Sequence, residues 1–257
     1  MSIVTPSLNQ AKYIEHTIKS VLAQDYPNIE HIIVDGGSTD GTVKILKKYK
    51  HLRWISEKDN GQSDAINKGA RMAKGKFIGW LNSDDLYYPH AVSTSIKALR
   101  AHPEAAMAYS DCDLIDGNGR VIDRMISRNY NEYLHLLWRN AIPQPTAFMR
   151  RNSFMKAGML DTSMHYCMDW ELWIRLGRVG KLIRINGCLA AFRLIRGTKT
   201  YSNTEGFKKE ITAVCDRYGV PAIFWALRQD VKKMLFDNDL LHKYNGILKF
   251  ASSIFPV

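Results

Sequence analysis

The first 85 residues alternate between short apolar runs and segments with helical periodicity, and this alternation restricts the fold more than any other feature. The apolar runs predict strands at Ser2–Thr5, Glu30–Asp35, Leu52–Ser56 and Phe77–Leu81. Helices are predicted between them at Tyr13–Gln24, Thr42–Tyr49 and Asp64–Ala73. Strands that alternate with helices indicate an α/β protein with a mostly parallel central sheet flanked by helices.

Carboxylates follow two of these predicted strands. Asp35 ends the second strand, and Asp84 and Asp85 follow the fourth. Because ligands of parallel α/β sheets bind beyond the carboxyl ends of the strands, we expect these residues at a functional edge. Two adjacent carboxylates repel each other, and a Mg²⁺ or Mn²⁺ ion would relieve that repulsion. The competing interpretation is that one of the pair only caps the next segment.

The second half of the chain is less regular. It predicts a strand at Ala106–Ser110, a hairpin turn at Asp116–Gly119, a helix at Asp169–Arg178 and a strand at Cys188–Leu194. From Glu205 onward the pattern is that of basic amphipathic helices.

Positive charge is concentrated toward the C-terminus. The net charge is +11, and residues 181–257 carry 13 Lys and Arg against 6 Asp and Glu. Such a segment favours an anionic partner, namely nucleic acid, acidic lipid or a phosphorylated substrate, or else it only adds solubility. Its lysines lie among apolar residues, which predicts either an interfacial helix on anionic lipid or a helical extension packed on the domain. These lysines are Lys208, Lys209, Lys232, Lys233, Lys243 and Lys249.

The cysteines and the apolar runs bear on the compartment. Cys112, Cys167, Cys188 and Cys215 have no zinc-like spacing, so we expect free, buried thiols in a reducing compartment. No signal peptide is recognised, and no apolar run approaches the roughly 20 residues that span a bilayer. We therefore expect a cytoplasmic protein, peripheral on the inner face of the plasma membrane if the basic segment contacts lipid.

Several motifs occur together in a specific order. They are TPSLNQ, VDGGSTDGT, DAINKG and LNSDD in the first half, then IPQPTAFMRR at 142–151 and MDWELWIRL at 168–176. In combination they resemble family 2 glycosyltransferases, which have the GT-A fold, over about residues 2–200. The resemblance implies a GT-A nucleotide-diphospho-sugar transferase domain at 1–204, with a nucleotide-binding half at 1–111 and an acceptor half at 112–204. Residues 205–257 would then form a basic helical C-terminal extension.

The resemblance implies an inverting, metal-dependent transferase. It would move a sugar from a nucleotide-diphosphate donor, with a UDP-sugar favoured, to a glycan or lipid-linked acceptor in bacterial surface polysaccharide or lipid-linked glycan synthesis. An alternative is a sugar-phosphate nucleotidyltransferase, but TPSLNQ lacks the glycine-rich, basic loop that such an enzyme needs. A basic nucleic-acid-binding protein is the alternative of another class. No nucleic-acid-binding motif supports it, and a carboxylate edge would repel phosphate in the absence of a metal.

On the donor side, the resemblance implies that Asp35 accepts hydrogen bonds from the base or ribose, that Asp84 meets the ribose, and that Asp85 holds the divalent metal. The other residues implied to line the nucleotide site are Thr5, Pro6, Ser7, Asp64, Asn67 and Ser83. For Asp64 and Asn67, helix capping or helix-surface polarity is an equally good explanation.

On the acceptor side, the resemblance implies that Asp169 is the general base that deprotonates the acceptor hydroxyl, with Glu171 in reserve. Capping of the following helix is the competing role for Asp169. Trp170 would stack on an acceptor sugar or pack in the core. Three further residues are expected at the acceptor site or in its loops: Gln144, Arg196 and Lys199.

One position departs from the family pattern. Many members carry a histidine in an R-x-H segment, and Ile195 occupies that position here. An isoleucine cannot bind a cation. Either water, the diphosphate and Asp85 complete the metal site, or Arg196 supplies positive charge to the leaving group.

Overall fold

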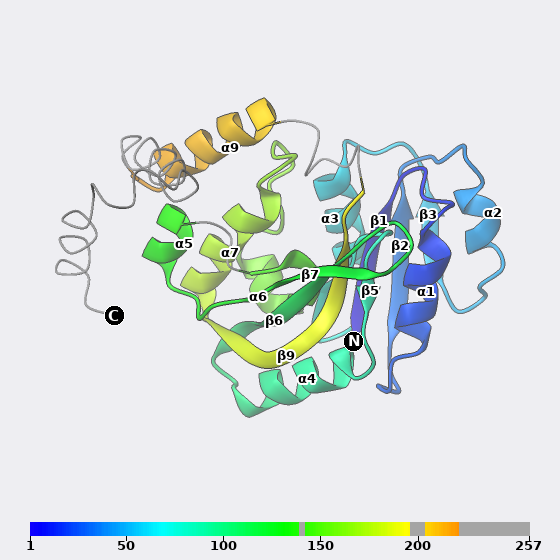
Figure 1. The fold of residues 1–257 in the computed structure, drawn as a ribbon, viewed down its shortest axis with the longest axis horizontal. Coiled ribbons are helices and arrows are strands. Elements are labelled where there is room, and N and C mark those ends of the chain that lie inside the picture. The colour runs from blue at the N-terminus through cyan, green and yellow to red at the C-terminus, as the bar shows by residue number, and fades with distance from the viewer. Residues whose placement is uncertain (139–141, 196–203, 221–257) are drawn as a thin grey trace.

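The computed structural model describes residues 1–138, 142–195 and 204–220. Within these ranges nine strands form one sheet, in the order β3-β2-β1-β4-β8-β6-β9-β5, with β7 paired to β6. Helices cover both faces of the sheet (Figure 1).

The first half contains the predicted parallel sheet. Its strands are β1 (Ser2–Ser7), β2 (Glu30–Asp35), β3 (Arg53–Ser56) and β4 (Phe77–Trp80), and all their mutual pairings are parallel. Its helices are α1 (Ile14–Leu22), α2 (Thr42–Leu46) and α3 (Gln62–Met72). The expected alternation of strand and helix is therefore confirmed for this half.

The second half makes the sheet mixed. Its strands are β5 (Leu86–Tyr87), β6 (Ala105–Ile115), β7 (Val121–Met125), β8 (Phe148–Arg150) and β9 (Lys181–Arg193). The β6 and β9 strands pair in parallel, whereas β8 is antiparallel to both β4 and β6, and β5 is antiparallel to β9. The remaining elements are α4 (Ala91–Ala101), α5 (Glu132–Trp138), the 3₁₀ turn η1 (Gln144–Thr146), α6 (Arg151–Lys156), α7 (Met168–Val179) and α9 (Thr204–Arg217).

Two strands are longer than their apolar runs predicted, because charged residues inside them are paired. Asp111 of β6 accepts a hydrogen bond from Arg184 of β9 at 3.0 Å. Asp113 of β6 accepts one from Arg124 of β7 at 2.6 Å. Paired charges can lie in a strand at little cost, and an apolar pattern does not detect them. The turn at Asp116–Gly119 is confirmed, since it joins β6 to β7.

Helix α9 is part of the domain core. Its Val214 and Cys215 are buried in the largest apolar cluster, together with Trp170 and Trp173 of α7. The expected division at residues 204 and 205 therefore crosses a continuous core, and we propose that the folded unit extends through Val220. Of the region from 205 onward, residues 221–257 lie outside the described part.

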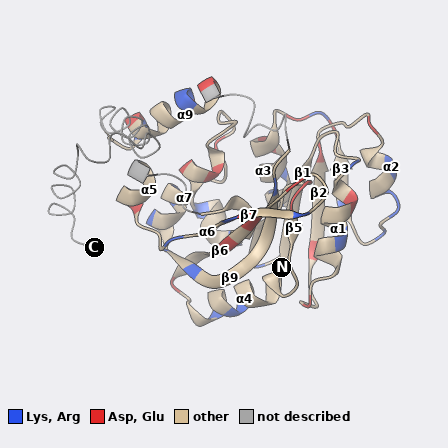
Figure 2. Cartoon of the chain, in the orientation of Figure 1, with Lys and Arg blue, Asp and Glu red and all other residues tan. Residues whose placement is uncertain are grey.

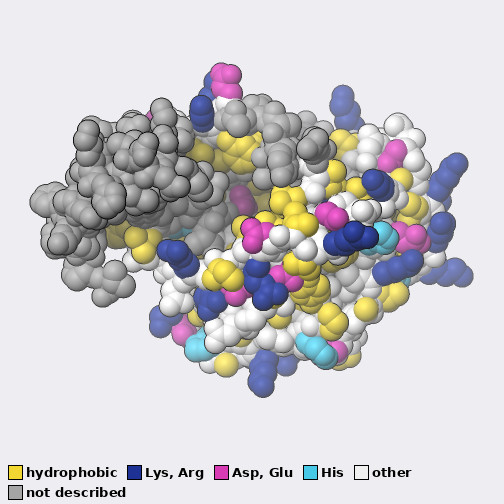
Figure 3. Space-filling view, in the orientation of Figure 1, with side chains coloured by type: hydrophobic (Ala, Val, Ile, Leu, Met, Phe, Trp, Pro, Cys, Tyr) yellow, Lys and Arg dark blue, Asp and Glu magenta, His cyan; other side chains and the backbone are white. Residues whose placement is uncertain are grey.

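The charge of α9 is mixed. Figure 2 shows both acidic and basic residues along it. Lys208 and Lys209 are exposed, and Lys209 pairs with Glu205 at 3.4 Å. The remaining lysines of the predicted interfacial pattern, Lys232, Lys233, Lys243 and Lys249, lie outside the described residues. Elsewhere, Lys and Arg side chains gather along the rim formed by α1 and α2 (Figure 3).

All four cysteines are free, as expected, and Cys188 is the one that is only partly buried. Among the helices that the structure describes, none is both long and apolar enough to cross a membrane.

Candidate active site

The residues predicted at one edge of the sheet do lie there. Strands β1, β2 and β4 run in parallel, so Ser7, Asp35 and the turn after Trp80 lie at the same end of the sheet. Asp84 and Asp85 occupy that turn.

Asn82 organises the turn. Its side-chain oxygen accepts hydrogen bonds from Gln62 at the start of α3 and from the indole N–H of Trp80, both at 2.8 Å. Its amide nitrogen donates to Gln144 at 2.8 Å and to Asp85 at 3.1 Å. Gln144 in turn donates to the Trp80 carbonyl at 2.7 Å. The predicted residue Gln144 therefore belongs to this edge, and it is held by the turn itself.

The two adjacent carboxyl groups differ in exposure. Asp85 is fully buried, and its Oδ1 accepts the backbone N–H of Arg193 at 2.9 Å. Asp84 is only partly buried, whereas Ser83 before it is buried. Of the two carboxylates, Asp84 is therefore the one that is more accessible from solvent, and the metal contact expected of Asp85 stays a prediction.

The carboxyl pair is electrostatically strained. Burial raises the pKa of Asp84 above its usual range. Burial, and secondly the Asp84 charge, raise the pKa of Asp85 well above its usual range. A nearby positive charge would lower the free energy of the ionised pair, which is the condition a divalent cation meets.

Arg193, at the end of β9, is the cation already present beside this pair. Its guanidinium donates to backbone carbonyls, at 2.8 Å from Asp84 and 2.9 Å from Asp116, and it lies over the ring of Tyr13. Arg193 therefore holds the backbone of the turn. Its side-chain hydrogen bonds go to carbonyl groups, so its positive charge only partly offsets the negative charge of the two carboxylates.

Asp35 is held by hydrogen bonds from the chain itself. It is fully buried, and it accepts hydrogen bonds from the Ser38 hydroxyl at 2.5 Å and the Ser56 hydroxyl at 2.7 Å, besides the backbone N–H groups of Gly37 and Ser38. Three of these bonds reach Oδ2 and one reaches Oδ1, so Asp35 holds the turn after β2 against the end of β3, and its contact with the base or ribose stays a prediction.

The TPSLNQ and VDGGSTDGT motifs are joined to each other. The Asn9 N–H donates to the Ser38 hydroxyl at 2.7 Å, and the Thr39 N–H donates to the Asn9 side chain at 2.9 Å. The carboxylate of Asp40 accepts the Ala11 N–H at 2.8 Å. The two motifs therefore form one rigid double loop at the sheet edge.

Within TPSLNQ, the three predicted residues differ. The Thr5 hydroxyl bonds to His31 at 3.0 Å, and both side chains are buried. Pro6 is also buried. The Ser7 hydroxyl is buried with no hydrogen-bond partner among the described residues. A buried hydroxyl without a partner is costly, so Ser7 is the residue of this segment best suited to receive a ligand.

The DAINKG helix contributes little to the predicted pocket. Asn67 is buried and forms two hydrogen bonds with the backbone of Leu160, at 2.8 and 3.0 Å, so it joins the two halves of the domain and does not face a nucleotide. Asp64 accepts the Asn60 N–H at 3.1 Å and lies 3.5 Å from Lys68, as expected of a residue that caps its helix.

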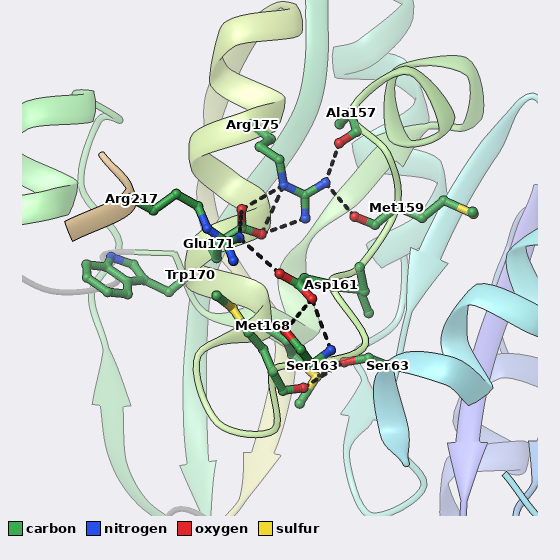
Figure 4. Close-up of polar contacts among 12 residues, drawn as sticks. Ser63, Ala157, Met159, Asp161, Ser163, Met168, Trp170, Glu171, Arg175 and Arg217 are labelled. Atoms are coloured by element: carbon green, nitrogen blue, oxygen red, sulfur yellow. Dashed lines mark hydrogen bonds and ion pairs between the residues drawn. The ribbon is translucent and has the colours of Figure 1, made fainter. Parts of the chain in front are cut away.

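Helix α7 carries the acceptor-side candidates. Asp169 is the second residue of the helix and is partly buried. Trp170 is buried in the core, and its indole N–H donates to the His135 carbonyl at 2.9 Å, so stacking on a sugar is excluded in this arrangement. Glu171 is fully buried. It accepts hydrogen bonds from Arg175, as Figure 4 shows, and from the Tyr218 hydroxyl at 2.8 Å.

These contacts exclude Glu171 as a reserve base, because a base must reach the acceptor hydroxyl. We expect Glu171→Gln to lower the free energy of unfolding by about 3 kcal/mol, since Arg175 would lose its buried partner. Urea unfolding measures this change. Glu205→Gln, which alters an exposed ion pair, is the control and should change stability by less than about 1 kcal/mol. An unchanged unfolding midpoint for Glu171→Gln would contradict the structural role.

A metal at this edge would have few protein ligands among the described residues. No group of three His, Cys, Asp or Glu side chains suited to a metal occurs within the described ranges. Ile195 is described and cannot ligate, and Arg196 and Lys199 lie outside the described residues. A site with one or two carboxylates suits Mg²⁺ or Mn²⁺ that is bound together with substrate phosphate.

Three residues of the edge were missed from the sequence: Asn82, Gln62 and Arg193. For two of them, sequence position was the available evidence. Asn82 lies two residues before Asp84, and Gln62 is the first residue of the helix beside the turn. Their bonds join segments that are distant in sequence, so spacing does not reveal them.

Several known proteins have sequences that are similar to this chain. Residues 2–158 match the family model described as glycosyl transferase family 2. An uncharacterised glycosyltransferase of Rickettsia prowazekii is 31% identical over 190 residues, which cover 71% of this chain and 60% of that protein. TuaG of Bacillus subtilis, a glycosyltransferase assigned to teichuronic acid biosynthesis, is 29% identical over 220 residues, covering 81% of this chain and 84% of TuaG. The chain thus spans less than two thirds of the Rickettsia relative.

Solved structures have the same fold. Staphylococcus aureus TarS 1–349 in complex with UDP-GlcNAc superposes with a TM-score of 0.67 at 18% identity, covering 83% of this chain and 65% of that chain. The mannosyltransferase PcManGT of Pyrobaculum calidifontis, in complex with GDP-Man and Mn²⁺, has a TM-score of 0.60 at 19% identity, covering 77% and 57%. The predicted GT-A fold is confirmed.

Proposed function

This chain belongs to glycosyl transferase family 2, and we propose that it transfers a sugar from a nucleotide-diphosphate donor to an acceptor hydroxyl with inversion at the anomeric carbon. The observation that carries this function is the sheet edge at which the partly buried Asp84 lies beside the fully buried Asp85, in a turn held by Asn82. Such an edge provides a carboxylate for a metal-bound diphosphate without enclosing the metal in protein.

Asp84 is the residue we assign to the metal. It is the accessible member of a pair whose pKa values are raised, and one carboxylate leaves most coordination positions for phosphate and water. A Mg²⁺ or Mn²⁺ ion there would stabilise the charge of the departing diphosphate. Asp85 orients the turn by accepting the Arg193 N–H.

The donor is proposed to be a nucleotide sugar, with a UDP-sugar favoured. The structural neighbours support this class, since TarS was solved with UDP-GlcNAc and PcManGT with GDP-Man. Ser7, whose buried hydroxyl has no partner among the described residues, is the proposed contact on β1.

Asp169 is the proposed general base. It lies in the first turn of α7, where the helix dipole favours the ionised carboxylate that a base requires. Deprotonation of the acceptor hydroxyl as its oxygen attacks the anomeric carbon gives a single displacement, and therefore inversion.

The acceptor is proposed to be a glycan or a lipid-linked glycan at the inner face of the plasma membrane. The similarity to TuaG supports a role in polysaccharide synthesis. Contact between the basic C-terminal region and anionic lipid is part of this proposal and is consistent with the net charge of +11.

Calorimetry tests nucleotide binding directly. UDP and GDP are titrated into the protein with and without Mn²⁺, and hydrolysis of UDP-glucose, UDP-GlcNAc and GDP-mannose is then measured. We expect Mn²⁺-dependent binding of one nucleoside diphosphate and slow hydrolysis of its sugars. Failure to bind either nucleotide under both conditions would overturn the proposed function.

The affinity for Mn²⁺ in the presence of UDP is expected to fall as the pH is lowered from about 7 to about 5. Protons compete with the metal for Asp84, and because the pKa of Asp84 is raised, this competition begins at a higher pH than for an ordinary aspartate. Calorimetric titrations across this range measure the change. An affinity that is constant over the range would contradict the assignment of a metal ligand with a raised pKa.

A further inference from the structure

The loop of residues 161–167 leads directly into α7 and so determines where Asp169 lies. It carries little secondary structure of its own. Cys167, the residue at the N-cap position of α7, makes no side-chain capping hydrogen bond. The N-terminus of α7 is therefore not fixed by a local cap.

Glu210 of α9 binds the backbone that leads into this helix. Its carboxylate accepts three consecutive backbone N–H groups, from His165 at 2.7 Å and from Tyr166 and Cys167 at 2.8 Å each. Hydrogen bonds to a carboxylate are about twice as strong as neutral ones, so this contact fixes the last three residues before α7. A glutamate from another helix thus anchors the segment that enters α7, up to and including its N-cap residue.

A second residue of α9 holds the beginning of the same loop. Arg217 donates to Asp161 at 3.0 Å and lies 3.3 Å from Glu171 (Figure 4). Burial by itself would raise the pKa of Asp161, but the hydrogen bonds from Ser163 and Arg217 hold it below the usual value. Glu210 and Arg217 are seven residues apart, which places them on one helix face about 10 Å apart along the axis.

The opposite side of the loop rests on α3 of the nucleotide-binding half. The Ser63 hydroxyl donates to the Met164 carbonyl at 3.1 Å, and Asn67 bonds to the backbone of Leu160. A Cβ added to Gly61 would lie 3.6 Å from the His165 ring. The loop is therefore held between two helices. One is α3, which starts beside the sheet edge that carries Asp84 and Asp85, and the other is α9, which follows the residues 2–158 that match the family model.

We propose that Glu210 is a positioning residue that holds the 161–167 loop so that Asp169 is directed at the acceptor oxygen. The inference rests on the proposed function, because it takes Asp169 as the base. In this proposal α9 contributes to catalysis by positioning the base. Removal of the Glu210 carboxylate would leave three N–H groups without their acceptor, and the backbone would be less firmly held two residues before Asp169.

Kinetics of Glu210→Ala and Glu210→Gln, in the full chain, test this role. The substrate is the nucleotide sugar that the wild-type protein hydrolyses fastest among UDP-glucose, UDP-GlcNAc and GDP-mannose. We expect kcat to fall roughly 10- to 100-fold in Glu210→Ala, the range that a small misplacement of a reacting group produces. Glu210→Gln retains one acceptor oxygen and should recover part of that loss. The KM for the donor and the calorimetric affinity for UDP should stay unchanged.

Glu205→Gln is the matched control, because it lies on the same helix and pairs only with exposed Lys209 in the described structure. It should keep the wild-type kcat. A wild-type kcat in both Glu210 variants would overturn the inference, as would a loss of UDP affinity equal to the loss of kcat, which would indicate general unfolding.

Asp169→Asn, measured in the same assay, separates the two proposals. If Asp169→Asn is inactive while both Glu210 variants are fully active, the positioning role fails and the proposed function stands. Full activity of Asp169→Asn would overturn the base assignment and the positioning role together.

Discussion

Asp169→Asn is expected to lower kcat by about 10²- to 10⁴-fold, the contribution that general-base assistance typically makes. Asparagine has nearly the same shape but cannot accept the proton of the acceptor hydroxyl. The residue lies in the first turn of α7 and is only partly buried, so the fold and the affinity for UDP should be retained. Steady-state hydrolysis or transfer rates, together with calorimetry of UDP binding, measure both quantities.

Asp123→Asn is a suitable control for this substitution, because Asp123 is an exposed acid on β7. It should keep wild-type kinetics. If Asp169→Asn also kept them, Asp169 would be only an acidic residue that interacts favourably with the dipole of α7, whose N-cap position Cys167 occupies. A loss of UDP affinity in Asp169→Asn would instead place the residue at the donor.

Asp84→Ala is expected to abolish Mn²⁺-dependent UDP binding and nearly all activity while leaving the melting temperature unchanged or slightly raised. The substitution removes the accessible carboxylate. It also removes the Asp84 charge, which adds to the effect of burial in raising the pKa of Asp85. Calorimetry with and without Mn²⁺ and thermal unfolding without metal measure the two effects.

Asp85→Ala provides the contrast. It removes the acceptor of the Arg193 N–H and of the Asn82 amide, and each buried donor left without a partner costs about 1–3 kcal/mol. Removal of a buried charge offsets part of this cost, so we expect a net loss of stability. If Asp85→Ala lost the metal at unchanged stability while Asp84→Ala kept it, the metal would belong to Asp85.

The sequence was sufficient to predict the parallel half of the sheet and the edge that carries the site. Regular apolar periodicity specifies strands and helices locally, and the end of each strand follows from the polar residue after it. Asp35 and the Asp84–Asp85 pair were therefore placed correctly at one edge. The family assignment was also available from the motifs and is confirmed.

The roles of individual polar residues were harder to predict, as Asn67 and Asp35 show. Asn67 was expected at the nucleotide, but its partner is the backbone of Leu160, 93 residues away. The Asp35 carboxylate is satisfied partly by Ser56, from a different strand. A carboxylate or amide in a motif has the same hydrogen-bonding capacity in either role, and only the position of its partner distinguishes a ligand contact from a structural one.

What the sequence alone determined is thus the α/β architecture, the family, and the set of acidic residues from which the site is built, because these depend on local pattern. Tertiary structure decided which carboxylate is accessible. Asp84 and Asp85 are adjacent in sequence, but Asp85 is fully buried and accepts the N–H of Arg193, 108 residues later, whereas Asp84 is partly exposed. Tertiary structure also decided that α9 belongs to the domain. Glu210 can accept hydrogen bonds from three N–H groups only because a loop that is distant in sequence lies against its carboxylate.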